Sequence, residues 1–450
     1  MKEISVIGGG LAGCEAAWQA SKMGAKVTIF EMKPSKFSPA HKTEGLAELV
    51  CSNSLRSDVL HNAAGLLKEE MRLFGSIVME AAEATRVPAG SALAVDRVSF
   101  SDYITLKLSQ RKNVEIVRKE IDNIPEFDEN RVTVIASGPL TSKNLSDAIA
   151  DLVGEEYFYF YDAVSPVINA DSIDFNVAFR QSRYSEEDKA YINCPLNKDQ
   201  YNSFVAELLS SKKVGTKDFE KALFFEGCMP IEEMASRGRE TLAHGPMKPV
   251  GISDPETGKR FYAVVQLRQE DKNGSMYNMV GFQTRLIHSE QKRIFRMIPG
   301  LEHAEFLRLG SMHRNTYINS PAHLSTTTLL KTRPDILFAG QITGVEGYIE
   351  SAATGIIAGI NASLLAGGKT PVTPPSSTAT GGLLKHITES DPKTFQPMNV
   401  NFGLIPQTEV KKGRKLKRAE RRKSVSLTAI NDMKKWIDKE LRFNHSTDRA

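Results

Sequence analysis

The chain has 450 residues, of which 41% are hydrophobic and 25% charged, a composition typical of a folded protein with two or three domains. No basic segment followed by an apolar segment opens it, so we expect no signal peptide. The most apolar segment, residues 351–368, contains Ser, Thr, Asn and Gly, which favours a buried helix over a membrane span. Four cysteines without a regular spacing indicate a reducing compartment, the cytoplasm.

The first predicted elements form a dinucleotide-binding unit. Residues 4–7 predict a strand, residues 14–23 a helix, and residues 26–30 a second strand that ends on Glu31. Between the first strand and the helix, the sequence G-x-G-x-x-G permits a tight turn and the close approach of a pyrophosphate to a helix N-terminus. Glu31 is placed to accept hydrogen bonds from a ribose, and its charge argues against a 2′-phosphate. We expect the site to contain Gly8, Gly9, Gly10, Leu11, Ala12, Gly13 and Glu31.

A loop after the second strand leads to Cys51-Ser52-Asn53-Ser54, where small polar residues surround one cysteine. This pattern suggests the edge of a cofactor pocket, although a small buried cysteine would also explain it. Residues 62–85 then predict one long helix, and Ser99 with Asp102 predicts the capped start of another. Residues 113–118 and 131–136 predict strands of the same unit.

From residue 157 the pattern changes to a mixed α/β segment, which we expect to be an insertion reaching to about residue 304. It contains two predicted strands, 262–268 and 277–282, separated by an Asp-Lys-Asn-Gly turn. Cys228 stands between Gly227 and a Met-Pro step, on a constrained turn that suits an exposed thiol. A cysteine packed within the turn is the alternative interpretation.

The chain then returns to nucleotide-binding features. Residues 335–339 predict a strand that runs into Gly340 and Gln341, and residues 349–366 predict a helix rich in small residues, including Gly355. The N-terminus of this helix would favour negative charge on a reduced flavin. The preceding segment, 312–317, combines the potential ligand-binding side chains of His313 and Arg314 with other polar groups.

The basic residues are concentrated near one end of the chain. The net charge is +4, but residues 411–423 alone carry +8, which leaves −4 for the rest. Such a run favours a polyanion such as RNA, and residues 425–441 predict an amphipathic helix beside it. The basic residues are Lys411, Lys412, Arg414, Lys415, Lys417, Arg418, Arg421, Arg422 and Lys423.

Five motifs together resemble the bacterial folate- and FAD-dependent tRNA (uracil-5-)-methyltransferases: residues 7–17, 51–54, 226–230, 312–317 and 338–348. The opening motif is common to many flavoproteins, whereas the two cysteine motifs are specific. The resemblance implies an α/β fold with a discontinuous Rossmann-like FAD-binding domain of the two-dinucleotide flavoprotein type. Its expected parts are residues 1–156 and 305–370, with the insertion at 157–304 and a basic helical extension at 371–450.

The resemblance also implies the chemistry. FAD, methylenetetrahydrofolate and NAD(P)H would serve to convert a uridine of the tRNA T-loop to 5-methyluridine, with Cys228 as the nucleophile at uracil C6. Cys51 would be its partner, as a base or an alternative covalent thiol, and the order of the two stays open. His313 and Tyr348 would line the folate and flavin face. No metal, membrane or protein partner is expected.

Three alternative functions remain open, besides a ribosomal RNA target for the same chemistry. One is the larger flavoprotein that modifies wobble uridines of tRNA. The second is a plain FAD-dependent NAD(P)H oxidoreductase, and the third is an RNA-binding protein in which FAD is only structural.

Overall fold

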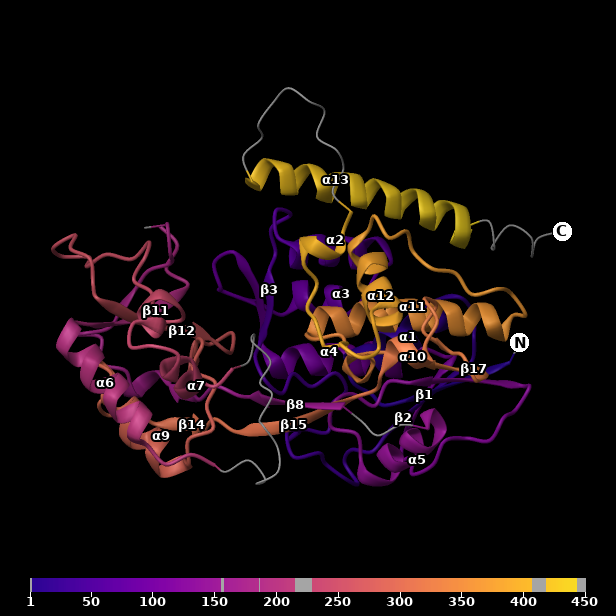
Figure 1. Ribbon diagram of the computed structural model, residues 1–450, viewed down its shortest axis with the longest axis horizontal. Helices are drawn as coiled ribbons and strands as arrows, with labels where there is room; N and C mark the ends of the chain where they lie inside the picture. The colour runs from indigo at the N-terminus through magenta and orange to yellow at the C-terminus, as the bar shows by residue number, and fades with distance from the viewer. Residues whose placement is uncertain (1, 155–157, 186, 215–228, 407–417, 443–450) are drawn as a thin grey trace.

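The computed structural model describes residues 2–154, 158–185, 187–214, 229–406 and 418–442. Two sheets with separate hydrophobic cores lie side by side, and a two-stranded ribbon connects them, as Figure 1 shows. The ribbon consists of β8 (Phe158–Ala163) and β15 (Met312–Tyr317), which pair antiparallel. The chain therefore leaves the first unit along one strand and returns along its neighbour.

The first sheet has the strand order β16-β17-β7-β1-β2-β6 among the described residues. All its strands are parallel except β16, as expected for a sheet whose apolar strands are covered on both faces. The predicted strand, glycine turn, helix and second strand at the N-terminus are confirmed. The strands are β1 (Glu3–Ile7), β2 (Val27–Glu31), β6 (Val114–Arg118), β7 (Arg131–Ile135), β16 (Leu329–Leu330) and β17 (Arg333–Phe338).

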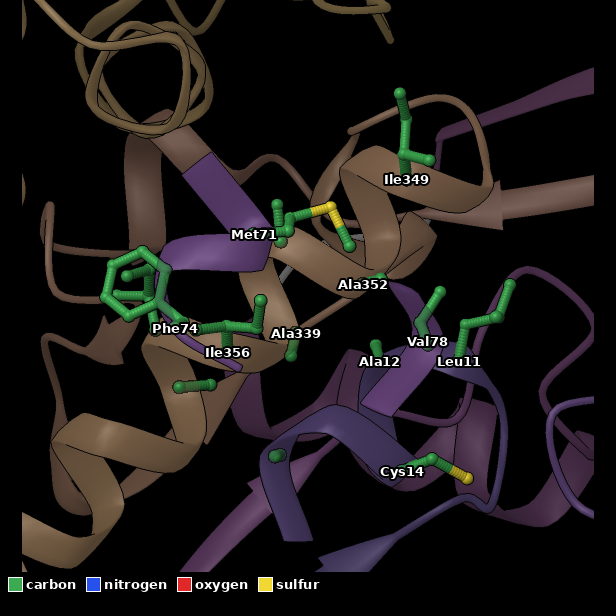
Figure 2. Close-up of a cluster of buried hydrophobic side chains, with 14 of the residues drawn as sticks. Leu11, Ala12, Cys14, Met71, Phe74, Val78, Ala339, Ile349, Ala352 and Ile356 are labelled. Carbon is green, nitrogen blue, oxygen red and sulfur yellow. The ribbon is translucent and has the colours of Figure 1, made fainter. Parts of the chain in front are cut away.

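Helices cover both faces of this sheet. One face carries α1 (Leu11–Lys22) and α11 (Tyr348–Ala366), while α5 (Lys143–Val153) shares a core with the other face. In Figure 2 side chains of α1, α2 (Ala63–Leu73) and α11 meet in one apolar cluster. Helix α11 is long and apolar enough to cross a membrane, but 94% of its most apolar window is buried inside the protein. This burial agrees with the prediction of a core helix.

Two sequence predictions in this unit are wrong in detail. The helix expected over residues 62–85 is two helices, α2 and α3 (Ile77–Ala84), because Gly75 takes a φ of +61° and Ser76 caps the second helix. Helix α4 (Arg97–Ser109) begins before Ser99, since the Asp96 side chain accepts from the Ser99 N–H. A small sheet of β3 (Ser54–Ser57), β4 (Arg86–Val87) and β5 (Ala92–Val95) adjoins these helices.

The second sheet has the order β10-β11-β12-β13-β9-β14 and is antiparallel. It runs to Arg308 and so extends past residue 304, where the insertion was expected to end. Its strands are β9 (Val167–Asn169), β10 (Phe179–Arg180), β11 (Tyr191–Leu196), β12 (Ala263–Gln269), β13 (Met276–Met279) and β14 (Phe306–Arg308). Its helices are α6 (Lys198–Ser210), α7 (Ile231–Ser236), α8 (Thr241–His244) and α9 (His288–Phe295).

The C-terminal segment packs back onto the first unit. Short α10 (Ser320–His323) precedes β16, α12 (Ala379–Glu389) follows α11, and α13 (Arg418–Trp436) lies across α2 at the top of Figure 1. A π-helical turn, Ile437–Arg442, continues α13. The helix expected over 425–441 therefore begins earlier and includes the last part of the basic run. Trp436 anchors it edge-on against Phe74 of α2.

Candidate functional site

A cavity of about 1060 Å³ lies at the carboxyl ends of the first sheet. This is where open parallel sheets bind their ligands. The second glycine corner, predicted at Gly340, meets the first one here, because a Cβ on Gly340 would stand 2.8 Å from the Ala12 Cβ. The predicted residues that line the cavity are Gly8, Gly9, Gly10, Leu11, Ala12, Glu31, Gly340 and Gln341.

The glycine loop is held open toward this cavity. Gly8 has a φ of +107°, and a Cβ there would lie 2.4 Å from the Ala136 carbonyl oxygen. Glu31 Oε2 accepts from the Gly9 N–H at 2.9 Å and Oε1 from the Lys33 N–H at 3.0 Å. Among the described residues, no side chain caps Gly10 at the start of α1 and no acidic residue occupies its first turn. The positive end of the helix is thus available to an anion such as a pyrophosphate.

Two of the predicted cofactor glycines are not among the described lining residues of this cavity and instead allow close packing, Gly13 of α1 against the loop after β1 and Gly355 of α11 against α1. A Cβ on Gly13 would lie 1.9 Å from the Gly8 carbonyl oxygen, and one on Gly355 would lie 2.2 Å from the Ala12 carbonyl oxygen. Gly355 therefore lets α11 approach the first turn of α1 closely. The structure thus gives Gly355 a packing role, and its predicted contact with the cofactor stays a prediction.

A second cavity, of about 1140 Å³, adjoins the first, and the two share the lining residues Val50, Pro139, Leu140, Gln341 and Tyr348. Cys51 lines this second cavity and is half-buried, whereas Cys14 and Cys194 are fully buried. Burial raises the pKa of both those thiols. Of the described cysteines, only Cys51 is thus placed to meet a substrate.

The segment around Cys51 is fixed by side chains from distant elements. The Tyr348 hydroxyl accepts from the Cys51 N–H at 2.7 Å and from the Ser52 N–H at 3.2 Å. The Arg97 guanidinium donates to the Cys51 carbonyl at 3.3 Å and is itself paired with Glu270 at 2.5 Å. Burial, with a smaller effect of Cys51, raises the pKa of Tyr348, so its hydroxyl stays protonated near neutral pH. The thiol therefore projects from a fixed backbone.

Sequence reasoning missed the charged groups of this cavity. Glu346 is buried there, and burial, followed by the nearby Asp162 and Glu350 carboxylates, raises the pKa of Glu346 well above its usual range. Gln341 Nε2 donates to Glu346 Oε2 at 2.7 Å. Glu346 belongs to the glycine-rich motif 338–348, so an acidic residue in that motif could have been predicted from the sequence as a residue of this cavity. Arg97 lies in no motif and only the fold brings it here.

The predicted ligand-binding residues of the ribbon point to different faces. His313 lines the second cavity with its Nε2 3.0 Å from the Ser311 Oγ, and burial lowers the pKa of its imidazole. Arg314, the next residue of β15, is exposed and stacks 3.9 Å from the centre of the Tyr159 ring. Alternation along a strand explains why only one of two adjacent residues reaches the cavity.

Several predicted residues lie outside the described part of the chain, namely Cys228 and the basic residues from Lys411 to Lys417. Ile231, three residues after Cys228 in the sequence, donates its N–H to the Gln283 carbonyl at 2.7 Å. Gln283 lines the second cavity. Arg418, Arg421, Arg422 and Lys423 belong to the first turns of α13, with Arg421 and Lys423 exposed.

The sheet order, the two glycine corners and the uncapped helix facing the cavity define a Rossmann-like FAD-binding protein. The family model described as glucose inhibited division protein A matches residues 3–370. A relative from Geotalea daltonii named methylenetetrahydrofolate--tRNA-(uracil-5-)-methyltransferase TrmFO is 58% identical, over 96% of this chain and 98% of its own. One of the same name from Acetivibrio thermocellus is 55% identical, over 97% and 99%. The chain belongs to this methyltransferase family, which confirms the resemblance found in the sequence.

A solved structure shares the fold at low sequence identity. The structure of Aquifex aeolicus GidA in its form I crystal has a TM-score of 0.69 and 18% identity, over 96% of this chain and 76% of that chain. At this identity the likeness concerns the architecture alone.

Proposed function

We propose that this protein methylates C5 of a uridine in the T-loop of tRNA, with methylenetetrahydrofolate as carbon donor and FAD, reduced by NAD(P)H, as cofactor. The observation that carries the proposal is the position of Cys51. It lies on a fixed backbone at a cavity continuous with the dinucleotide cavity, in a chain that matches the methyltransferases over nearly its whole length. Folate, NAD(P)H and tRNA occur together in the cytoplasm, where we place the reaction.

The residues present fit FAD. The backbone of Gly8 to Ala12 and the N-terminus of α1 would hold its pyrophosphate, Glu31 its ribose, and Gly340 with Gln341 the part nearer the second cavity. When bound, FAD supplies the electrons that complete the methyl group. The protein contributes the enclosure around this cofactor, in which the Tyr348 side chain lies between the two cavities.

In this proposal two cysteine thiols act on the uracil ring. Uracil C5 becomes nucleophilic once a thiolate adds to C6, and cysteine is the side chain best able to add and later leave. We assign the addition to Cys228 and the removal of the C5 proton to Cys51, with Cys51 as the alternative covalent thiol. The Ile231 N–H donates a hydrogen bond to the carbonyl of Gln283, and Gln283 lines the same cavity as Cys51. Because Ile231 follows Cys228 by three residues in the sequence, this hydrogen bond supports a role for both cysteines.

The folate would enter the second cavity. His313 suits this position because burial favours its neutral imidazole, a flat group on which a pterin stacks. Tyr348, expected on the same face, has a further task, since its hydroxyl fixes the Cys51 segment. Arg314 lies on the other face of the ribbon and is assigned to RNA.

The basic run would hold RNA phosphates. Arg421 and Lys423 are exposed on α13, whose apolar face is anchored to the first unit, so the charges stand on a rigid support. Contacts to phosphates give affinity and salt dependence more than sequence choice. A ribosomal RNA uridine is therefore the second candidate substrate for the same chemistry.

A wobble-uridine flavoprotein, a plain oxidoreductase and an RNA-binding protein with structural FAD receive less support. Relatives that are 54–58% identical and 98–99% covered by this chain are named as methyltransferases, which does not favour the larger wobble-uridine flavoprotein. A plain oxidoreductase, or an RNA-binding protein in which FAD is only structural, leaves the fixed cavity cysteine without a task.

The test combines the purified flavoprotein with methylenetetrahydrofolate, NADPH and unmodified tRNA transcript, followed by nucleoside mass spectrometry. We expect 5-methyluridine from tRNA with the wild type and none with Cys228→Ala, while NADPH oxidation by both proteins stays equal. Formation of 5-methyluridine only in ribosomal RNA would move the assignment to the second candidate. Absence of the product from every RNA, or unchanged methylation by Cys228→Ala, would refute the proposal.

A further inference from the structure

A third cavity, of about 350 Å³, adjoins Cys51 on the side of the second sheet. It shares Cys51, Ser52, Arg268 and Gln283 with the second cavity, so the two are continuous. Its remaining walls come from Ser165 before β9, Asn278 of the inner strand β13, and Val280 and Gly281 just after β13. The dinucleotide cavity, the Cys51 cavity and this smaller one thus form a single connected path.

Asn278 is the buried side chain of this cavity whose amide nitrogen has no partner among the described residues. It lies on β13 directly opposite Arg268 of β12, is only 3% exposed, and its Nδ2 has no hydrogen-bond partner among the described residues. Burial of an unpaired amide group is costly, so buried polar groups in folded proteins are almost always paired. An amide kept unpaired in a cavity wall indicates that a ligand completes its hydrogen bonds.

Arg268 gives the same cavity a fixed positive charge. Its Nε donates to Asn53 Oδ1 at 3.0 Å and one terminal nitrogen to Ser52 Oγ at 2.7 Å, and both acceptors are neutral. No carboxylate of the described residues forms an ion pair with it, although the side chain is buried. The Glu270 carboxylate lies near enough to act on its charge but forms no direct ion pair with it, so the guanidinium can still attract carbonyl oxygens and developing negative charge.

Gln283 supplies a second carboxamide at the junction with the second cavity. Its side chain is half-buried and makes no hydrogen bond within the described part of the chain, whereas its backbone carbonyl accepts from Ile231. The cavity therefore offers two carboxamides, each with a donor and an acceptor, and one guanidinium. Val280 and Gly281 add an uncharged wall.

We propose that this third cavity binds the uracil base of the substrate and that Asn278 reads its imide edge. The edge presents a carbonyl acceptor, the N3–H donor and a second carbonyl acceptor, so one carboxamide pairs with N3–H and a neighbouring carbonyl. Arg268 favours a carbonyl at C4 over the amino group of cytosine, and it stabilises the negative charge that reaches the C4 oxygen when a thiolate adds to C6. This inference rests on the proposed function and assigns the specificity of that site.

The experiment uses RNA hairpins with the T-arm sequence that carry uridine or 3-methyluridine at the target, since the methyl group removes the N3–H. We expect the wild type to methylate the uridine RNA with a kcat/KM on the order of 10–100-fold higher. Asn278→Ala should lose activity on uridine by a similar factor and no longer distinguish the two RNAs. Its flavin content and NADPH oxidation should equal those of the wild type.

Two further variants keep the test decisive. Gln283→Met, at a half-buried position, should reduce the same discrimination even if Asn278→Ala folds poorly. Asn193→Ala is the matched control, because it removes a buried asparagine of the same sheet whose side chain is already hydrogen-bonded within the protein. This variant should still distinguish uridine from 3-methyluridine even if its free energy of unfolding is lower. Discrimination that persists in both cavity variants would come from the RNA and would overturn the inference. If the wild type methylates neither of the two hairpins and no whole tRNA, the result contradicts the proposed function itself and not only the assignment of Asn278.

Discussion

The first and second cavities are built in different ways, although they share five lining residues. Backbone lines much of the first: glycine turns at Gly8–Gly10 and Gly340 and the open N-terminus of α1. Side chains from separate elements make the second, where Arg97 of α4 and Tyr348 of α11 fix the segment of Cys51. The difference teaches that the first cavity is encoded largely by local sequence, whereas the second exists only after the two units have folded together.

The two cavities also differ in charge. Besides the helix end, carboxylates and one ammonium group line the first, from Glu31, Glu48, Glu120 and Lys119, whereas guanidinium groups gather at the second. Arg308 donates to the carbonyls of Val50 and Cys51, and burial, with the nearby Arg97, lowers the pKa of Arg308 to about 10. Three guanidinium groups, of Arg97, Arg268 and Arg308, thus lie around one cysteine segment. Such a concentration of buried cations suits a reaction in which anions form.

The largest effect should follow from Cys51→Ala. If the second cavity is the reaction centre, methylation should fall on the order of 100- to 10,000-fold, as for loss of a proton-transfer group, while FAD content and NADPH oxidation remain. The measurements are nucleoside mass spectrometry and the flavin absorption spectrum. The matched control is Cys194→Ala, a thiol fully buried in the second sheet, which should keep its methylation activity. Loss of flavin in Cys51→Ala would show that the two cavities are not separable.

A smaller effect is expected when the first cavity is disturbed through its packing. In Gly355→Ala the new Cβ would meet the Ala12 carbonyl at 2.2 Å, so α1 and α11 must separate. We expect the free energy of unfolding to drop by about 1–3 kcal/mol and FAD binding to weaken with it. Urea unfolding and flavin titration measure the two quantities.

Gly10→Ala is the matched variant for this prediction. A Cβ on Gly10 meets no atom within 4 Å, and the position has an ordinary φ of −76°. Stability should stay near that of the wild type, while FAD binding weakens because the methyl group stands in the pyrophosphate position. Equal stability of Gly355→Ala and Gly10→Ala would contradict the assignment of Gly355 to helix packing.

The contrast between the cavities also explains how far the sequence could lead. The strand, glycine turn, helix and terminal Glu31 form one contiguous pattern, so the fold class and most of the glycine-loop residues that line the first cavity were predictable. Arg97, Glu270 and Arg268 lie in no motif, and their approach to Cys51 depends on the packing of the second sheet against the first unit. No local pattern records a contact between residues so far apart in the chain.

The errors have equally local causes. The predicted helix over 62–85 continues its apolar spacing through Gly75, and only a positive φ there divides it. Gly355 looks like a cofactor residue because its helix begins at the cavity, yet it lies two turns along that helix. Arg314 was grouped with His313 by adjacency, whereas strand alternation separates their faces.

The smallest effect is expected from α13, which lines neither cavity. Replacing Arg421 and Lys423 together by Gln should reduce tRNA affinity a few-fold and lower the slope of log affinity against log salt by roughly 0.7–0.9 for each phosphate that is no longer neutralised. Lys434→Gln with Lys435→Gln changes the same charge at exposed positions near the other end of the helix and should leave the slope unchanged. Filter binding across a salt series measures this slope. Flavin content and NADPH oxidation of both double variants should equal those of the wild type. If both pairs lower the slope equally, the whole helix attracts RNA through its net charge and residues 421–423 do not form a defined phosphate site.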